Sequence, residues 1–321
     1  MNKIILNIST KKNLLAFSGG VDSTALFFLL LEQNIPFDIA IIDYNQRVQS
    51  KKEVEYAHYL AKKYNKICYT TIFSPDIKFS EKIARDYRYN FFENIIKNNS
   101  YEALLTAHQL NDKLEWFLMQ FTKGAGLSEL LSFQKETFKG DMFVLKPLLD
   151  YTKEQLLDYL KKNNIKYFID KSNFDHKYKR NYFREVYSNK LLEQFSSGIK
   201  NSFDYLQNDL ASLLIDTKEI KDHKLTIIEY NGDKNIAIRL VDKELKKRGF
   251  IISKATRDEI LTQKEIVISS KIAISIKENK IFIAPYIQNI KMDKKFKEKC
   301  RVQKIPKNIR GYLYQKEENL C

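Results

Sequence analysis

Six consecutive residues near the start of the chain combine the small and polar types that bind phosphate. The run Ser18-Gly19-Gly20-Val21-Asp22-Ser23 follows a strand-length apolar run and precedes a helical pattern. A strand that turns through two glycines into a helix directs several backbone N–H groups at one point, at the positive end of the helix dipole. Ser18 and Ser23 add hydroxyl donors, and Asp22 offers an oxygen ligand to a Mg²⁺ ion that bridges phosphates. The run therefore predicts a phosphate site, although it lacks the Walker pattern.

A second polar cluster, from Thr106 to Glu115, also follows an apolar run and enters a helical pattern. His108 could support proton transfer or contact a nucleotide, and Asp112 is the carboxylate best suited to activate or orient an amine. A structural interpretation stays open, in which Asn111 or Asp112 only caps the helix and His108 packs inside the protein.

Two further segments carry groups that suit a nucleotide. Arg85 and Arg88 are three residues apart in a helical pattern and so share a face, from which Arg88 could stabilise a phosphate in a transition state. An ordinary solvated face is the alternative. Gly124 and Gly126 would let the backbone approach a nucleotide closely, or Gly124 would simply end the preceding helix.

The densest polar run extends from Asp170 to Arg184. Its Asp, Ser and Asn residues predict an ordered polar loop, and Arg180 and Arg184 lie four residues apart on a predicted helix that could grip phosphate. A surface turn followed by a basic helix is the alternative. The candidate substrate-binding residues of this run are Asp170, Ser172, Asn173, Asp175, Arg180, Asn181 and Arg184.

The elements that must position these residues alternate between strand and helix through the first half of the chain. Strand-length apolar runs at 13–17, 37–43, 66–73 and 103–107 are each followed by a helical pattern, at 24–34, 51–65, 80–97 and 111–121. Four such units predict an α/β fold, a Rossmann-like parallel sheet with helices on both faces. Such sheets bind ligands at the carboxyl ends of their strands, where most of the polar clusters fall.

The second half of the chain changes character. The expected elements are helices at 151–164, 190–214, 235–248 and 255–261, a strand at 225–229, and alternating strands through 265–285 with a turn at Glu278-Asn279. The long helix at 190–214 suggests a linker, and the remainder a small α+β domain. We expect a catalytic domain over residues 1–200, followed by a linker and a substrate-binding domain over 201–321.

Composition points to a polyanionic partner in a reducing compartment. The chain of 321 residues has a formal net charge of +15, which favours nucleic acid, although a general richness in Lys, Asn and Ile contributes to it. Cys68, Cys300 and Cys321 are too far apart for a zinc, iron–sulfur or dithiol motif. The longest apolar run is too short to cross a bilayer, so we expect a soluble cytoplasmic protein without a membrane partner.

The loop at 18–23 resembles the signature of the PP-loop ATP pyrophosphatases, which split ATP into AMP and pyrophosphate while adenylating a substrate. The run from Asp170 to Arg184 is similar to the motif D-x-S-N-x-D-x-x-F-x-R-N-x-x-R of the tRNA(Ile)-lysidine synthases, with Tyr178 in place of Phe. Residues 84–89, 106–115 and 123–127 resemble that family's A-R-x-x-R-Y, A-H-H-x-D-D-Q-x-E-T and R-G-x-G-L. Positions that depart from the family pattern include Tyr44, Gln109, Asn111 and Lys113.

This resemblance implies a ligase that forms a C–N bond. ATP activates the C2 carbonyl oxygen of the wobble cytidine of a tRNA(Ile) with a CAU anticodon, and free L-lysine then displaces AMP to give lysidine, which changes decoding from AUG to AUA. It implies ATP bound at 18–23 with Gly124 and Gly126, Mg²⁺ at Asp22, and tRNA bound partly by the second domain. Catalysis would fall to Asp112, His108 and Arg88.

Two other functions remain open from the sequence. A tRNA thiolase could use the same loop but would need cysteines near the site, whereas Cys68 lies in a predicted strand. A nucleotide-binding tRNA module without catalysis is compatible with the replaced motif positions. The oligomeric state is also open, a homodimer included.

Overall fold

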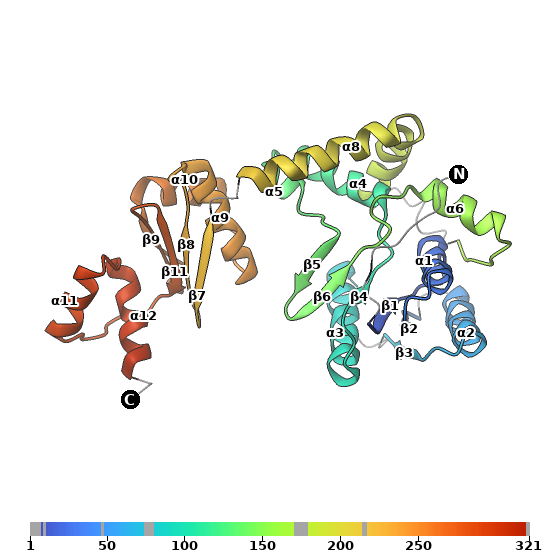
Figure 1. Cartoon of the computed structure of the whole chain (residues 1–321), viewed down its shortest axis with the longest axis horizontal. Helices are drawn as coiled ribbons and strands as arrows, with labels where there is room; N and C mark the ends of the chain where they lie inside the picture. The colour runs from blue at the N-terminus through green and yellow to red at the C-terminus, as the bar shows by residue number, and fades with distance from the viewer. Residues whose placement is uncertain are drawn as a thin grey trace. The chain divides into compact units, whose positions relative to one another are not determined.

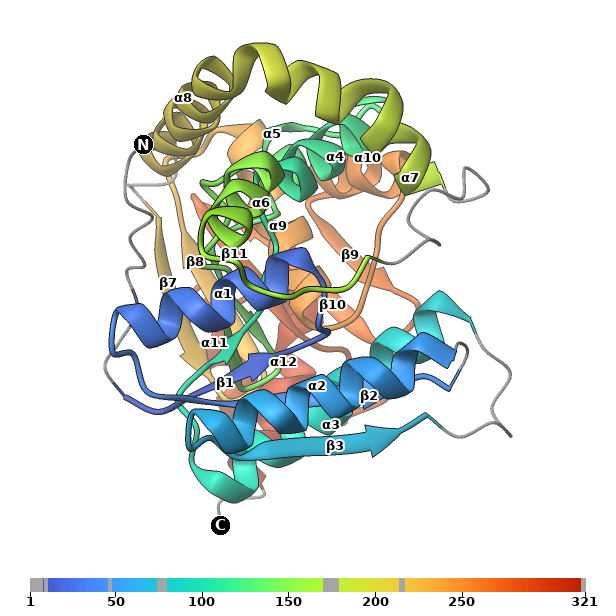
Figure 2. The same cartoon turned by 90° about the vertical axis from the view of Figure 1, so that its right-hand side faces the viewer.

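The computed structural model describes residues 8, 11–45, 48–73, 80–169, 179–213 and 217–318. Contacts within the chain divide it into two compact units, Met1–Leu206 and Gln207–Cys321. Figure 1 labels most of the helices and strands, and Figure 2 also labels α7 and β10. Within the described ranges, every helix is too short or too polar to span a lipid bilayer.

The first unit is built on a six-stranded sheet whose strand order is β3-β2-β1-β4-β6-β5. Its strands are β1 (Asn13–Ala16), β2 (Phe37–Asp43), β3 (Cys68–Ile72), β4 (Leu104–Leu105), β5 (Glu136–Lys139) and β6 (Met142–Leu145). All neighbours pair in parallel except β5, which pairs antiparallel with β6. The order changes direction between β1 and β4, and open α/β sheets bind their ligands at such a switch point.

Helices cover both faces of this sheet, as the sequence predicts. They are α1 (Val21–Glu32), α2 (Val48–Lys63), α3 (Glu81–Asn99), α4 (Leu110–Phe121), α5 (Leu127–Leu130) and α6 (Lys153–Lys162). Because neighbouring strand residues point to opposite faces, Leu15 and Leu105 join a core with α1, α2 and α6, whereas Leu14 and Leu104 join another with α3. Figure 2 shows α1, α2 and α6 on the face nearest the viewer.

The hairpin of β5 and β6 adds one antiparallel strand to the parallel sheet that the sequence predicts. Gly140 and Asp141 form its two-residue loop between the paired residues Lys139 and Met142, and Gly140 has a φ of +60°. A two-residue Gly-Asp connection is typical of hairpins, so the local signal for these strands was present in the sequence. The hairpin extends the sheet beyond β4 by two strands.

The segment that closes the first unit is helical but irregular. It consists of α7 (Lys179–Phe183), the π-helical turn η2 (Arg184–Ser188) and α8 (Asn189–Leu213). The long helix expected at 190–214 is confirmed, although Phe195 interrupts it with a non-helical φ of −129°. The π-helical turn was not predicted, and such turns are often found at functional sites.

The second unit is an α+β structure around a five-stranded antiparallel sheet of order β7-β8-β11-β10-β9. The strands are β7 (Lys218–Asp222), β8 (Leu225–Glu229), β9 (Glu265–Ile268), β10 (Ile272–Lys277) and β11 (Lys280–Pro285), and the helices are α9 (Lys234–Lys247), α10 (Lys254–Gln263), α11 (Lys294–Val302) and α12 (Lys307–Glu318). The turn expected at Glu278-Asn279 is confirmed, and both residues have a positive φ. The strand β7 and the helices α11 and α12 were not predicted.

Candidate active site

The phosphate loop, residues 18–23, joins β1 to α1 beside the switch point of the sheet. Gly19 has a φ of +73°, and a Cβ atom there would lie 3.3 Å from Cδ2 of Phe168. The N–H group of Phe168 donates to the carbonyl oxygen of Gly19 over 2.9 Å. Position 19 therefore favours glycine for two reasons, the positive φ of its backbone and the close approach of the Phe168 ring.

Hydroxyl groups brace this loop while the helix behind it stays uncapped. Ser23 Oγ donates to the carbonyl of Gly20 over 3.3 Å and accepts from the N–H of Ser18 over 3.2 Å. The N-cap of α1 is Gly20, so no side chain caps this helix, whereas side chains cap α3, α4 and α6. The first-turn N–H groups and the positive end of the helix dipole therefore point at the loop without a side-chain partner, which suits a phosphate.

Asp22 has an environment that suits a cation. Its Oδ1 atom is buried and forms no hydrogen bond with any described residue. Burial, with the nearby Asp112 carboxylate, raises the pKa of Asp22 to about 7, against the charges of Lys153 and Arg184. A buried carboxylate oxygen without a partner is the donor that Mg²⁺ prefers, so Asp22 fits the ion that the sequence implies.

Asp22 would need help to hold that ion. Among the described residues, no cluster of three His, Cys, Asp or Glu side chains could hold a metal ion. Mg²⁺ commonly takes one or two carboxylates and completes its coordination with substrate phosphates and water. The site therefore fits an ion that binds together with a nucleotide.

His108 follows β4 on the other side of the switch point. Its Nδ1 atom lies 2.9 Å from Oγ1 of Thr106, and the Phe133 ring meets the imidazole edge-on with 5.3 Å between ring centroids. Burial lowers the pKa of His108 to about 4. The imidazole is therefore neutral at pH 7 and can accept or donate a hydrogen bond without adding positive charge.

Asp112 takes part in the N-terminal cap of α4, as the structural interpretation of this residue predicts. Gln109 is the N-cap of α4, and its N–H group donates to Asp112 Oδ2 over 3.0 Å. In return the side-chain oxygen of Gln109 accepts from the N–H of Asn111 over 2.6 Å. The second carboxylate oxygen of Asp112 does not take part in this cap.

That second oxygen belongs to an ion network between α4 and the α7–η2 segment. Arg180 Nη2 donates to Asp112 Oδ1 over 2.6 Å, and its Nε donates to Glu115 Oε2 over 2.9 Å. Arg184 Nε donates to Glu115 Oε1 over 2.6 Å. The Glu115 side chain is fully buried, while those of Arg184 and Arg180 are 17% and 43% exposed. The two arginines expected to grip phosphate thus neutralise two carboxylates.

The network also sets the charge of Asp112. Burial alone would raise the pKa of Asp112, but Arg180, His108 and Arg184 hold it below its usual value. A carboxylate of low pKa is a weak base toward an ammonium group with a pKa of about 10.4. The geometry therefore favours Asp112 as a group that orients an amine over one that deprotonates it.

Positions that depart from the family motif have structural partners. Asn111 Nδ2 donates to Asn189 Oδ1 over 2.9 Å, and Asn111 Oδ1 accepts from the N–H of Lys153 over 3.1 Å. Lys113 Nζ lies 4.5 Å from the centroid of the Phe203 ring. These two side chains join α4 to α6 and α8, whereas Gln109 caps α4 itself.

The carboxyl end of β2 adds a guanidinium to the site. Tyr44, which follows β2, forms a side-chain hydrogen bond with Arg88 of α3. The charge of Arg88 also contributes to the lowered pKa of His108. The departure at Tyr44 therefore gives Arg88 a partner.

Two predicted glycines lie at the far end of α4. Gly124 has a φ of +74°, and its N–H group donates to the carbonyl of Phe121 over 3.0 Å, which ends the helix. Gly126 is the N-cap of α5. At a rise of 1.5 Å per residue, the end of α4 that precedes these glycines is about 14 Å along the helix from Asp112. The structure does not bring them next to the ion network, and their contact with a nucleotide stays a prediction.

Part of the polar run lies outside the described residues. Arg180, Asn181 and Arg184 are described, and Asn181 is buried. The candidates outside the described ranges are Asp170, Ser172, Asn173 and Asp175.

Two lysines near the site were missed by sequence reasoning. Lys146 directly follows β6, and its Nζ donates to the carbonyl of Gln134 over 2.9 Å and to Oγ1 of Thr137 over 3.2 Å. Burial lowers the pKa of Lys146 to about 8. Lys153 is the first residue of α6, and its charge acts on Asp22. A search for polar residues at every strand end would have found Lys146.

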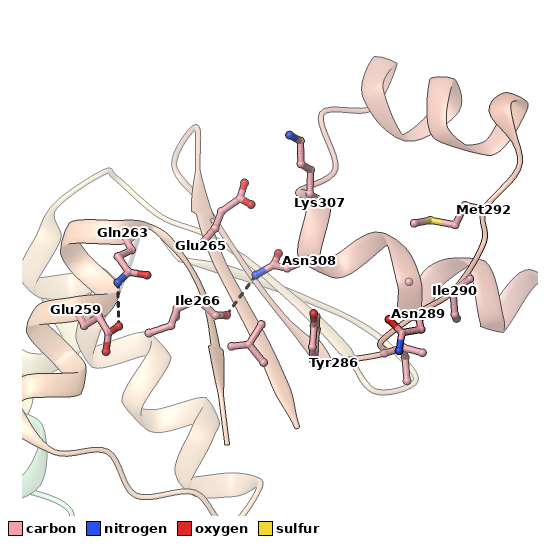
Figure 3. A pocket seen from close by; sticks show the side chains of 13 residues that line it. Glu259, Gln263, Glu265, Ile266, Tyr286, Asn289, Ile290, Met292, Lys307 and Asn308 are labelled. Atoms are coloured by element: carbon pink, nitrogen blue, oxygen red, sulfur yellow. Dashed lines mark hydrogen bonds between the residues drawn. The ribbon is translucent and has the colours of Figure 1, made fainter. Parts of the chain in front are cut away.

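The second unit has a pocket of its own, between β9, the segment after β11 and α12 (Figure 3). Its volume is about 640 Å³. The charged side chains that line it are Glu259, Glu265 and Lys307, and Gln263 Nε2 donates to Glu259 Oε1 over 2.9 Å. Two carboxylates against one ammonium group do not suit a phosphate, so the candidate active site is the one in the first unit.

Comparison with known proteins shows the family of this chain. The family model of the PP-loop domain matches residues 1–191. A tRNA(Ile)-lysidine synthase of Helicobacter pylori is 42% identical over 94% of this chain and 89% of its own length. Those of Wolinella succinogenes and Campylobacter jejuni are 41% and 40% identical, over 94% and 98% of this chain and 93% and 95% of their own lengths. The chain belongs to the tRNA(Ile)-lysidine synthase family.

One solved structure supports the fold of this lysidine synthase family member. A U34-tRNA thiolase of Methanococcus maripaludis aligns with a TM-score of 0.52 and 17% identity, over 64% of this chain and 74% of that one. At this level of identity the similarity supports the fold and says nothing of the substrate.

Removal of Glu115 should destabilise the first unit of this lysidine synthase family member. We expect Glu115→Ala to lower the free energy of unfolding by about 3–5 kcal/mol, because it leaves two guanidinium groups without their buried partner. Denaturant titration followed by circular dichroism measures the change. Glu193→Ala, on the exposed side of α8, is the matched control and should stay within about 0.5 kcal/mol of wild type. A loss below about 1 kcal/mol for Glu115→Ala would count against the network as a main support.

Asp22 should lower stability at neutral pH. The folded protein, with an Asp22 pKa of about 7, binds an extra proton relative to the unfolded chain, whose Asp pKa is about 3.9. Stability therefore falls as pH rises from about 4 to 7, and the loss persists above pH 7. We expect Asp22→Asn to raise the free energy of unfolding at pH 8 by on the order of 1–3 kcal/mol in EDTA, and by less at pH 5. Denaturant titrations at both pH values test this, and a variant that is less stable at pH 8 contradicts it.

Proposed function

We propose that this protein is a tRNA(Ile)-lysidine synthase that converts the wobble cytidine of a tRNA with a CAU anticodon to lysidine. The C2 carbonyl oxygen attacks the α-phosphorus of ATP, and pyrophosphate leaves. The ε-amine of free L-lysine then attacks C2, and the C2–O bond breaks as AMP departs and the amine loses its proton. Each nucleotide modified consumes one ATP and one lysine.

The observation that carries this proposal is the agreement of named relatives with the site geometry. Proteins named tRNA(Ile)-lysidine synthase match nearly the whole chain at 40–42% identity. An uncapped helix N-terminus suited to pyrophosphate lies close enough to Asp112 for the two sites to interact through Asp22. A phosphate-binding loop and a carboxylate suited to an amine therefore meet at one switch point.

The phosphate end of ATP is assigned to the loop at 18–23. Backbone N–H groups and the α1 dipole stabilise the charge that develops on the departing pyrophosphate. Asp22 would hold Mg²⁺, which neutralises phosphate charge when bound. Arg88 is exposed and forms a hydrogen bond with the Tyr44 side chain. We assign its guanidinium group to the α-phosphate oxygens of ATP, whose charge grows as the adenylate forms. His108, neutral at pH 7, supplies a hydrogen bond nearby.

The lysine substrate is assigned to the acidic end of α4. Arg180 and Arg184 bind Oδ1 of Asp112 and fix the orientation of its carboxylate, and we assign the ammonium group of lysine to Oδ2, which otherwise accepts from the N–H of Gln109. The ammonium group must lose a proton before attack, and Asp112 serves to place it while water accepts that proton. A second proton leaves the nitrogen once the C–N bond has formed, and the departing AMP or water accepts it. Gly124 and Gly126 remain assigned to the nucleotide, and residues 170–184 to the RNA.

The second unit is assigned to tRNA binding. Residues 291–310 contain nine lysines and arginines and two acidic residues. In α11, Phe296 and Cys300 are buried, while the lysines between them are exposed. A helix with an exposed basic face suits a phosphate backbone. A cytoplasmic location fits a protein that uses both ATP and tRNA.

A tRNA thiolase is less compatible with the described residues. Cys68 lies within β3, where burial raises the pKa of its thiol, and Cys300 is buried in the second unit. A reactive thiol has a lowered pKa instead. Cys321 lies outside the described residues.

A direct assay tests the function. We expect incubation with ATP, labelled L-lysine and tRNA(Ile) with a CAU anticodon to give labelled tRNA and one AMP per lysine incorporated. The same tRNA with uridine at the wobble position is the control and should stay unlabelled. Pyrophosphate release without labelled tRNA would contradict lysidine synthesis and favour another adenylating reaction.

Asp112→Asn removes the charge of Asp112 while its amide oxygen can still accept from the N–H of Gln109. Its amide nitrogen then replaces the acceptor of Arg180, so the free energy of unfolding of the variant is measured beside its kinetics. We expect the KM for lysine to rise roughly 10- to 100-fold, since the lost interaction is a hydrogen bond between charged groups. Pyrophosphate release in the first turnover should stay near wild type, because adenylation precedes lysine attack. A large fall in kcat with an unchanged KM would instead indicate that Asp112 acts as the base.

A further inference from the structure

A second pocket in the first unit lies between α1, α2 and the segment that follows α6, on the face shown in Figure 2. Its volume is about 760 Å³, within the range of small-molecule sites. Phe168, which packs against Gly19 of the phosphate loop, also meets the pocket residue Tyr56 edge-on with 5.7 Å between ring centroids. The pocket is thus distinct from the phosphate loop but connected to it through one side chain.

Aromatic rings form one wall of this pocket. Tyr56 and Tyr59 stack with 6.3 Å between centroids and an interplanar angle of 16°. Tyr56 is buried and fixed, because its hydroxyl donates to the carbonyl of Lys166 over 2.7 Å. Tyr59 is 56% exposed, so more than half of it is open to a ligand. A fixed ring that supports an exposed ring is a platform on which a nucleobase can stack.

Positive charge surrounds these rings. Lys63 Nζ lies 5.8 Å from the Tyr59 centroid, and Lys166 Nζ lies 5.5 Å from that of Tyr56. Lys52 also lines the pocket, and Glu55 is the one carboxylate among its lining residues. Three ammonium groups against one carboxylate attract a phosphate beside a stacked base.

We propose that this pocket binds a nucleotide of the RNA substrate, with its base stacked on Tyr59 and its phosphates near Lys52 and Lys63. The proposal rests on the proposed function, which supplies the RNA. Single-stranded nucleotides are recognised by exposed aromatic rings flanked by basic side chains, and the pocket combines both. ATP has its own site at the uncapped N-terminus of α1, so RNA is the nucleotide source left for this pocket.

Tyr59 variants test the stacking. We expect Tyr59→Ala to weaken binding of tRNA(Ile) with a CAU anticodon roughly 5- to 100-fold, which is the effect of losing one stacked base. Tyr59→Phe keeps the ring and should bind the tRNA within about twofold of wild type. ATP affinity should be unchanged in both variants, which also shows that the first unit is folded.

Lysine variants test the charge. Lys52→Glu should weaken tRNA binding and reduce the salt dependence of the binding constant by a slope of about 1 or more. Lys51→Glu makes the same charge change at the neighbouring exposed residue, which does not line the pocket, and should have the smaller effect. Equal effects of the two substitutions would overturn the proposal in favour of general electrostatic attraction.

The outcomes separate this proposal from the function on which it rests. Wild-type tRNA affinity in both Tyr59→Ala and Lys52→Glu overturns the pocket, even if the wild-type protein incorporates lysine. Loss of ATP affinity with unchanged tRNA affinity also overturns it, because the pocket would then serve a free nucleotide. If Tyr59→Ala loses tRNA affinity while the wild-type protein incorporates no lysine, the pocket stands and the proposed function fails.

Discussion

The site depends on one buried ion network, in which Glu115 and Asp112 on α4 meet Arg180 and Arg184. A fully buried carboxylate such as Glu115 is costly unless its charge is matched, and here two guanidinium groups match it. Since the arginines lie on the α7–η2 segment, charge neutralisation fixes where this segment packs. The same contacts hold Asp112 ionised beside the phosphate loop. Under the proposed function, folding and the placement of the lysine substrate therefore depend on the same hydrogen bonds.

The phosphate loop differs from this network, because it contains polar groups that have no side-chain partner among the described residues. Gly20 gives α1 no side-chain cap, and Asp22 keeps a buried oxygen without a partner among the described residues. Both lower the stability of the empty protein, and both are relieved when an anion and a cation bind together. The charges of Asp112 and Glu115, on one side of the switch point, are therefore paired within the protein. The helix N-terminus and Asp22, on the other side, would be paired by bound ligands.

Sequence predicted the parts of this arrangement that are local. Glycines followed by a helical pattern indicated the loop, and alternating strands and helices indicated a sheet covered on both faces. Contacts between residues distant in sequence were not predictable. The spacing of Arg180 and Arg184 indicated that they share one face of a helix, but it did not indicate that this face contacts Glu115. Gln109 is an unusual N-cap, so capping was expected at Asn111 or Asp112. The Gly140-Asp141 turn was a local signal that was overlooked.

The π-helical turn at Arg184–Ser188 constrains how the chain can vary in length. Each residue of a helix advances the chain by about 100° around the axis, so one residue more or fewer turns every upstream side chain by that angle. Here the turn begins at Arg184 and separates Arg180 from α8. Substitutions on its solvent side leave that register intact. A one-residue insertion or deletion would rotate Arg180 away from Asp112, so this segment tolerates changes of sequence far better than changes of length.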